Sequence, residues 1–159
     1  IFRLAEDFHF SFLPGTVIIM PRKEKLVTWC FPPAGFIKMN MDGCAKGNPG
    51  LAGFGGIVHD DAGRWIKSFF GFIGHTTSLM AKLWGIREGL GLKNVIIESD
   101  CEVAIGMLIN QNYEDNRYQA LICDSRSYAA KLGCCSFVHT LREGNSCADS
   151  LANMGSKQR

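Results

Sequence analysis

A glycine-rich segment, AKGNPGLAGFGG at residues 45–56, constrains the fold more than any other feature of the 159-residue chain. Five of its twelve residues are glycine, which disfavours a helix, and its Asn, Pro and Gly together favour a tight loop. The preceding segment, FIKMNMDG at 36–43, alternates apolar and polar side chains as a β-strand does. The segment at 53–74 contains two apolar runs joined by Asp-Asp-Ala-Gly, which is typical of a hairpin. We therefore expect three consecutive antiparallel strands.

After these strands, helical and strand-like apolar spacings alternate along the chain. Residues 76–90 begin with Thr and Ser, which favour helix capping, and continue with apolar residues at helical spacing. Ser99 or Asp100 is expected to cap the second helix. The remaining expected elements are a strand at 94–100, helices at 100–108 and 116–131, a strand at 134–141 and a helix at 145–157. The order β-β-β-α-β-α-α-β-α predicts an α/β fold with a mixed sheet, three antiparallel leading strands and then parallel strands, flanked by helices.

The first 34 residues differ in pattern from the rest of the chain. Pro14, Pro21, Pro32 and Pro33 interrupt them, and PRKEK at 21–25 is a run of charge with no helical apolar period. We expect residues 1–34 to be an N-terminal appendage or linker, and residues 35–159 to form a single domain.

Charge and composition exclude several classes of protein. Residues 36–155 carry eleven Lys and Arg against twelve Asp and Glu, so charge alone would not bind this domain to nucleic acid. No apolar run is long enough to span a membrane, and the N-terminus lacks the features of a signal peptide. The seven cysteines lack C-x-x-C spacing, which indicates mostly buried thiols in a reducing compartment, with a redox pair at Cys134–Cys135 as the alternative. We expect an intracellular protein, cytoplasmic or nuclear, and make no prediction of its oligomeric state.

Three aspartates fall at positions where an α/β fold brings residues together. Asp42 lies near the end of the first expected strand, Asp100 ends the fourth strand, and Asp149 lies in the first turns of the last helix. Parallel strands deliver their carboxyl ends to one edge of a sheet, where ligands tend to bind. Clustered carboxylates need cations, and Mg²⁺ takes oxygen ligands. The pattern predicts a Mg²⁺ site; the alternative is that each aspartate merely ends a turn or caps a helix.

Four blocks, in the same order, resemble ribonuclease H type 1. MNMDGCAKGNPGLAGFGGIV at 39–58 resembles the family's opening strand, loop and strand, and IIESD at 96–100 resembles the segment that carries its second Asp. HTLREGNSCADSLA at 139–152 resembles its closing block. WCFPPAGFIKMNMDG and LWGIREGL resemble the reverse-transcriptase-like ribonuclease H domains of plant retroelements. The resemblance implies Mg²⁺-dependent (or Mn²⁺-dependent) endonucleolytic hydrolysis of the RNA strand in RNA–DNA hybrids.

The resemblance also assigns roles to particular residues. Asp42 resembles the carboxylate that bridges two metal ions, Asp100 a ligand of the second ion and Asp149 a ligand of the first. His139 resembles a mobile histidine that moves a proton or assists product release; a purely structural histidine is the alternative. The resemblance places three further residues at the substrate, with Asn48 at the 2′-OH of the RNA strand. These residues are Gly43, Asn48 and Asn145.

One position departs from the family pattern at the expected metal site. The family carries a metal-ligating Glu early in its first helix, whereas this chain has Lys82, and Glu88 lies too far along the helix to replace it. An ammonium cannot ligate Mg²⁺, so we expect the second metal site to be lost or weakened. Two placements of Lys82 are open: as a surrogate cation paired with Asp42 and Asp100, or extended into solvent.

The second departure is a short connection after the first helix. GLGLKN at 89–94 follows the helix almost at once, where family members continue for about two more turns. We expect the helix to lose packing or the next strand to shift.

Three functional hypotheses follow from these observations. The first is an active Mg²⁺-dependent nuclease for RNA–DNA hybrids, which Lys82 disfavours. The second is a catalytically impaired domain that still binds nucleic acid. The third is a retroelement remnant with a marginally stable fold.

Overall fold

The computed structural model divides the chain into two units, residues 1–30 and 31–159. It describes residues 2–6, 9–11, 17–19, 23–27, 29–113, 117–132 and 134–158. In the first unit, β1 (Phe2–Glu6) pairs antiparallel with β4 (Lys23–Val27), and β2 (His9–Ser11) pairs antiparallel with β3 (Val17–Ile19). The division after Cys30 lies four residues before the boundary expected from the sequence. Pro14 and Pro21, on which that expectation partly relied, lie outside the described residues.

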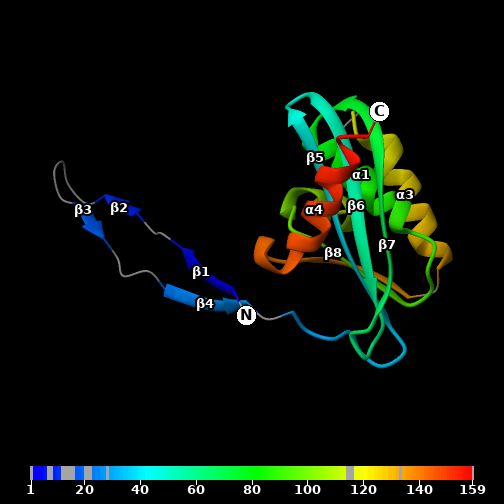
Figure 1. Ribbon diagram of the computed structural model, residues 1–159, viewed down its shortest axis with the longest axis horizontal. Helices are drawn as coiled ribbons and strands as arrows, with labels where there is room; N and C mark the ends of the chain where they lie inside the picture. Colours follow the sequence, from blue (N-terminus) through cyan, green and yellow to red (C-terminus); the bar gives the residue numbers. More distant parts are fainter. Residues whose placement is uncertain are drawn as a thin grey trace. The chain divides into compact units, whose positions relative to one another are not determined.

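The second unit is built on a five-stranded sheet (Figure 1). Its strands are β5 (Ile37–Gly47), β6 (Gly50–His59), β7 (Trp65–Thr76), β8 (Val95–Ser99) and β9 (Cys135–His139), in the spatial order β7-β6-β5-β8-β9. β5, β6 and β7 are antiparallel neighbours, whereas β8 pairs parallel with both β5 and β9. The mixed sheet with three antiparallel leading strands is therefore confirmed.

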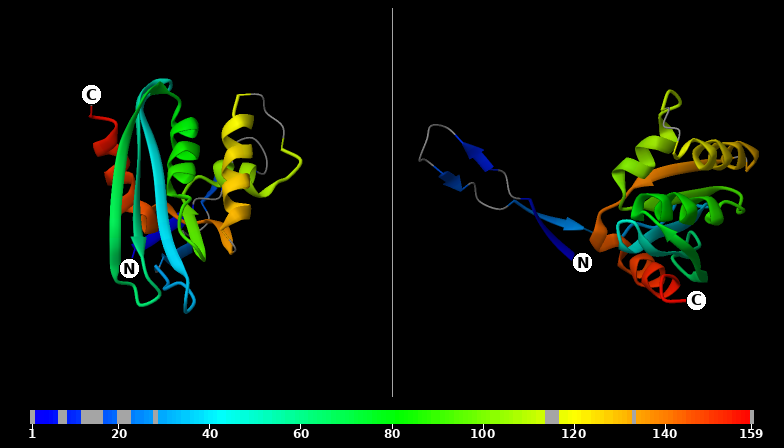
Figure 2. Two further views of the ribbon diagram at one scale, coloured as in Figure 1. Left: turned by 90° about the vertical axis from the view of Figure 1, so that its right-hand side faces the viewer. Right: turned by 90° about the horizontal axis from the view of Figure 1, so that it is seen from above.

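Helices cover both faces of this sheet. They are α1 (Ser78–Gly89), α2 (Glu102–Ile109), α3 (Gln119–Lys131) and α4 (Ser146–Gly155), with a short 3-10 helix, η1 (Arg142–Asn145), before α4. Figure 2 shows α4 on one face of the sheet and α1 with α3 on the other. α4 packs on β5, β6 and β7, while α1 packs chiefly on β5. Within the described residues, no helix is long and apolar enough to cross a membrane.

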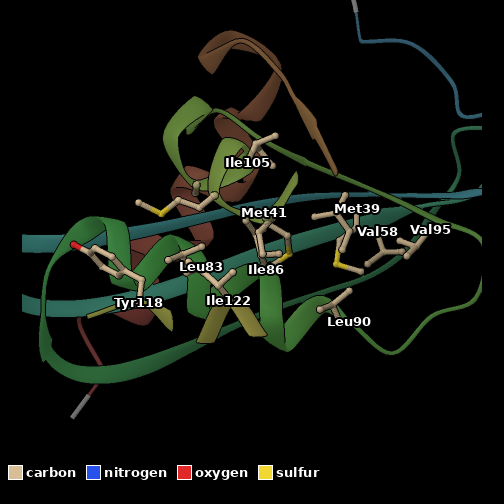
Figure 3. Close-up of a cluster of buried hydrophobic side chains, with 14 residues drawn as sticks. Met39, Met41, Val58, Leu83, Ile86, Leu90, Val95, Ile105, Tyr118 and Ile122 are labelled. Carbon is tan, nitrogen blue, oxygen red and sulfur yellow. The ribbon is translucent and has the colours of Figure 1, made fainter. Parts of the chain in front are cut away.

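The main core lies between β5 and the helices of the α1 face (Figure 3). Met39 and Met41 alternate with polar residues along β5 and are fully buried, as the strand-like spacing predicts. Leu83 and Ile86 meet them from α1, and Ile122 from α3. Burying side chains of this size stabilises a fold by roughly 1.5–3 kcal/mol each, so this interface fixes α1 against β5.

Helix capping follows the sequence expectation at α1 but not at α2. The Thr77 hydroxyl caps α1 by accepting a hydrogen bond from the Met80 amide at 3.2 Å. α2 begins after Cys101, with no side-chain cap, so the expected cap by Ser99 or Asp100 is wrong. Oδ1 of Asp100 pairs with Lys82 instead. α3 begins at Gln119; Asn116, where it was expected to start, lies outside the described residues.

The short connection after α1 distorts neither element. α1 keeps Leu83 and Ile86 fully buried, and β8 pairs with β5 in regular parallel register from Val95. β8 has only five residues and spans about 16 Å, less than the expected strand at 94–100 would have required. Asn94 adopts a left-handed conformation (φ 52°), which closes the five-residue connector. The expected loss of helix packing is therefore wrong, and the alternative, a shift of the strand relative to the family, stays a prediction.

β5 and α1 approach each other closely at Gly43. A Cβ atom at this position would overlap the backbone of Ala81 and Lys82. Only glycine allows this contact, and the contact sets the distance between the end of β5 and the first turns of α1.

Gly43→Ala is expected to destabilise the domain by about 2 kcal/mol or more, because two backbones would have to separate. Urea unfolding measures the effect. Gly106→Ala is the matched control: Gly106 is exposed in α2, and a Cβ there meets nothing within 4 Å. That change should stabilise the helix by up to about 1 kcal/mol. Equal effects at the two sites would show that the contact at Gly43 is not tight.

Candidate functional site

Asp42 and Asp100 lie side by side at one edge of the sheet. Asn40 of β5 is the register partner of Glu98 of β8, so the two aspartates stand two residues further along adjacent parallel strands. The side chain of Asp42 is 3% exposed and that of Asp100 12% exposed. The convergence expected from the sequence is therefore present in the structure.

Lys82, in the first turns of α1, bridges these two carboxylates. Its ammonium forms an ion pair with Oδ1 of Asp42 and donates a hydrogen bond to Oδ1 of Asp100 at 2.9 Å. The Lys82 side chain is 18% exposed, so it does not extend into solvent. The sequence left two placements of Lys82 open, and the structure shows the one in which Lys82 is a surrogate cation paired with both aspartates.

Burial and charge shift the pKa values of this group in ways that keep Lys82 charged. Burial, with a smaller contribution from the charge of Asp100, raises the pKa of Asp42 to about 6 against the opposing attraction of Lys82. Burial alone would lower the pKa of Lys82, but Asp42 and Asp100 outweigh it and the pKa is raised. The lysine is thus fully protonated at neutral pH.

A second lysine–carboxylate pair lies on the same face of the two strands. Lys38 Nζ is 2.6 Å from Glu98 Oε1, with both side chains at most 10% exposed. The amide of Asn40 donates to the other oxygen, Glu98 Oε2, at 2.9 Å. This buried pair joins β5 to β8 just before Asp42 and Asp100, and removal of either partner would leave an uncompensated buried charge.

The carboxylates open into a pocket of 460 Å³. Asp149, from the first turn of α4, lines it together with Arg142 of η1, and the Asp149 carboxylate accepts a long hydrogen bond (3.3 Å) from the Asn153 amide. Arg142 is exposed and was not among the residues singled out from the sequence, although it lies within the closing block. The lining residues are Asp42, Gly43, Cys44, Ala45, Ser78, Lys82, Asp100, Cys101, Arg142 and Asp149.

The side chains around this pocket do not fit a metal ion bound by Asp42, Asp100 and Asp149. In the part of the chain that the structure describes, no three His, Cys, Asp or Glu side chains gather closely enough to hold a metal. One oxygen of Asp42 and one of Asp100 face the ammonium of Lys82 instead. The described arrangement is that of two carboxylates bridged by one ammonium of the protein itself.

The other residues selected from the sequence are dispersed around the pocket. Gly43 lines it, and Asn48 is exposed in the β5–β6 turn, where its side-chain oxygen accepts from the Ser78 amide at 3.2 Å. His139 is exposed at the end of β9, beside Ser99, and does not line the pocket. Asn145 is 1% exposed and donates to the Met41 carbonyl at 3.0 Å, which ties η1 to β5; its role at a substrate stays a prediction.

Comparison with known proteins agrees with this architecture. Residues 40–155 match the family described as reverse transcriptase-like. A protein of Arabidopsis thaliana named for ribonuclease H is 35% identical over 142 residues, which cover 86% of this chain and 23% of that protein. This chain therefore spans about a quarter of the length of that relative.

Solved structures share the fold. Ribonuclease H1 of Halobacterium salinarum superposes with a TM-score of 0.71 at 22% identity, covering 76% of this chain and 97% of that one. LC11 ribonuclease H1, solved in complex with an RNA/DNA hybrid, superposes with a TM-score of 0.68 at 24% identity, covering 74% and 94%. The chain belongs to the reverse-transcriptase-like family and has the ribonuclease H fold.

Proposed function

We propose that residues 31–159 bind RNA–DNA hybrids at the Asp42–Asp149 pocket and are impaired in cleaving the RNA strand. The observation that carries the impairment is the ammonium of Lys82 between Asp42 and Asp100. A metal ligand must offer a lone pair, and a protonated lysine has none. Two of the three residues that the resemblance assigned to Mg²⁺ or Mn²⁺, Asp42 and Asp100, thus pair with a cation of the protein itself.

Binding is supported by the exposed elements around the pocket. Arg142 supplies a guanidinium beside it, suited to a phosphate oxygen. The exposed β5–β6 turn, with Asn48 and Lys46, lets a sugar-phosphate strand approach next to the first turn of α1. A domain of the same fold binds an RNA/DNA hybrid. We keep the expectation of an intracellular location, cytoplasmic or nuclear, as part of this proposal.

Binding is tested by fluorescence anisotropy with a labelled RNA–DNA hybrid, compared with duplex DNA of the same sequence. Arg142→Ala is expected to weaken hybrid binding about tenfold and to lower its salt dependence, because one phosphate contact is lost. Arg64→Ala is the control, since Arg64 lies on the β6–β7 turn and pairs with Asp60. Equal weakening by both variants, or no measurable hybrid binding at low salt, would contradict the proposal.

Cleavage is tested with the same hybrid in Mg²⁺ or Mn²⁺. We expect little cleavage by the wild type and a gain in Lys82→Glu, because the cation between the acids is replaced by a carboxylate. Lys82→Glu combined with Asp42→Asn should lose the gain. Efficient wild-type cleavage that Asp42→Asn abolishes would show that the domain is an active nuclease. Cooperative thermal unfolding of the wild type would speak against the remnant hypothesis.

The charge of the Lys82 pair is tested by the pH dependence of stability. The raised pKa of Asp42, about 6, makes the wild type lose stability as pH rises from about 4 to 6, where the folded state retains a proton that the unfolded state releases. Lys82→Met removes the cation and raises that pKa further. The variant should therefore lose about 1–3 kcal/mol at pH 8, where Asp42 is ionised, and less at pH 5. Urea unfolding at both pH values measures this.

Lys157→Met is the control for this experiment, because Lys157 is exposed beyond α4. It should change stability little at either pH. A loss for Lys82→Met that is the same at pH 5 and pH 8 would show that the lysine does not pair with an ionised Asp42.

A further inference from the structure

Every carboxylate that β5 and β8 place on the Asp42 face has a lysine beside it. Glu98 is paired with Lys38, and Asp42 and Asp100 share Lys82. The acids come from β5, from β8 and from the residue that follows β8. Lys82 comes from α1, whose backbone contacts Gly43 of β5. Two lysines of this chain thus offset two of the three negative charges on this face before any ligand is present.

The placement of Lys82 is specific rather than incidental. Its ammonium reaches Oδ1 of both aspartates at once, and its side chain is mostly buried. The backbone contact at Gly43 holds Ala81 and the backbone of Lys82 against β5, so the lysine side chain starts close to both aspartates. A metal ion that entered between Asp42 and Asp100 would have to expel this ammonium and lose its own hydration water, which Mg²⁺ gives up reluctantly.

We propose that Lys82 is a built-in replacement for a divalent cation at the Asp42–Asp100 pair, so that the site folds and binds nucleic acid without Mg²⁺ or Mn²⁺. The first part, the replacement of a divalent cation by Lys82, concerns this chain without a ligand. The second part, ion-independent binding, rests on the proposed function. Arg142 adds a positive charge to the pocket lining, and Asp149 adds a negative charge.

The first part is tested by thermal unfolding in EDTA and in millimolar MgCl₂, at matched ionic strength. The wild-type midpoint should be the same in both solutions. Lys82→Glu should unfold about 3–6 °C lower in EDTA, because three carboxylates then crowd together, and should recover with Mg²⁺. Lys82→Gln is the second variant if Lys82→Glu does not fold: it should be destabilised less, with a smaller response to Mg²⁺.

Metal entry is measured directly by paramagnetic broadening of backbone amide signals with Mn²⁺. In the wild type, the amides of Asp42 and Asp100 should broaden no more than that of Asp60, an acid on the distant β6–β7 turn. In Lys82→Glu or Lys82→Gln they should broaden selectively. Selective broadening in the wild type, or a wild-type midpoint that rises with Mg²⁺, would overturn the inference.

The second part is tested by hybrid affinity in EDTA and in MgCl₂ at matched ionic strength. The dissociation constant of the wild type should change less than about twofold, and Lys82→Glu should bind more weakly in EDTA than in MgCl₂. Hybrid binding that appears only with Mg²⁺ would overturn the ion independence and leave the proposed function standing. Absence of binding in both solutions, with an unchanged midpoint, would defeat the proposed function and leave the built-in cation standing.

Discussion

The contact of one ammonium with two buried carboxylates is the interaction on which the site depends. Asp42 and Asp100 stand close together on adjacent strands, and without a cation their charges would repel in a poorly solvated place. A protein can meet this need with bound metal or with its own side chain. This chain uses Lys82, and that choice decides both the electrostatics of the pocket and the chemistry that the pocket can perform.

The fold delivers that contact through backbone geometry. Gly43 lets α1 come close to β5, and the buried methionines of β5 hold the helix there against Leu83 and Ile86. The Lys38–Glu98 pair joins the two central strands on the face opposite to these methionines. Packing on one side and charge pairing on the other thus position the same two aspartates.

The order of elements could be predicted because each carries a local pattern: alternation in β5, the Thr77 cap, helical spacing in α1. The resemblance located the acids and the exceptional lysine, but two placements of Lys82 remained open, since a flexible side chain has no local pattern that fixes its end. The roles of Arg142 and Lys38 were missed because each depends on tertiary neighbours. Asn145 was expected at the substrate, yet its burial depends on where η1 meets β5.

The hydrogen bond from Asn145 to the Met41 carbonyl joins residues 104 positions apart. It has a consequence for the order in which the domain is assembled. The sheet and the Lys82 bridge need only residues up to His139, whereas η1 and α4, which bring Arg142 and Asp149, follow later in the chain. Contacts between residues so far apart in the sequence form late in folding, because the entropy lost on closing the loop between them must be offset first. The Lys82 bridge can therefore form before the pocket is complete.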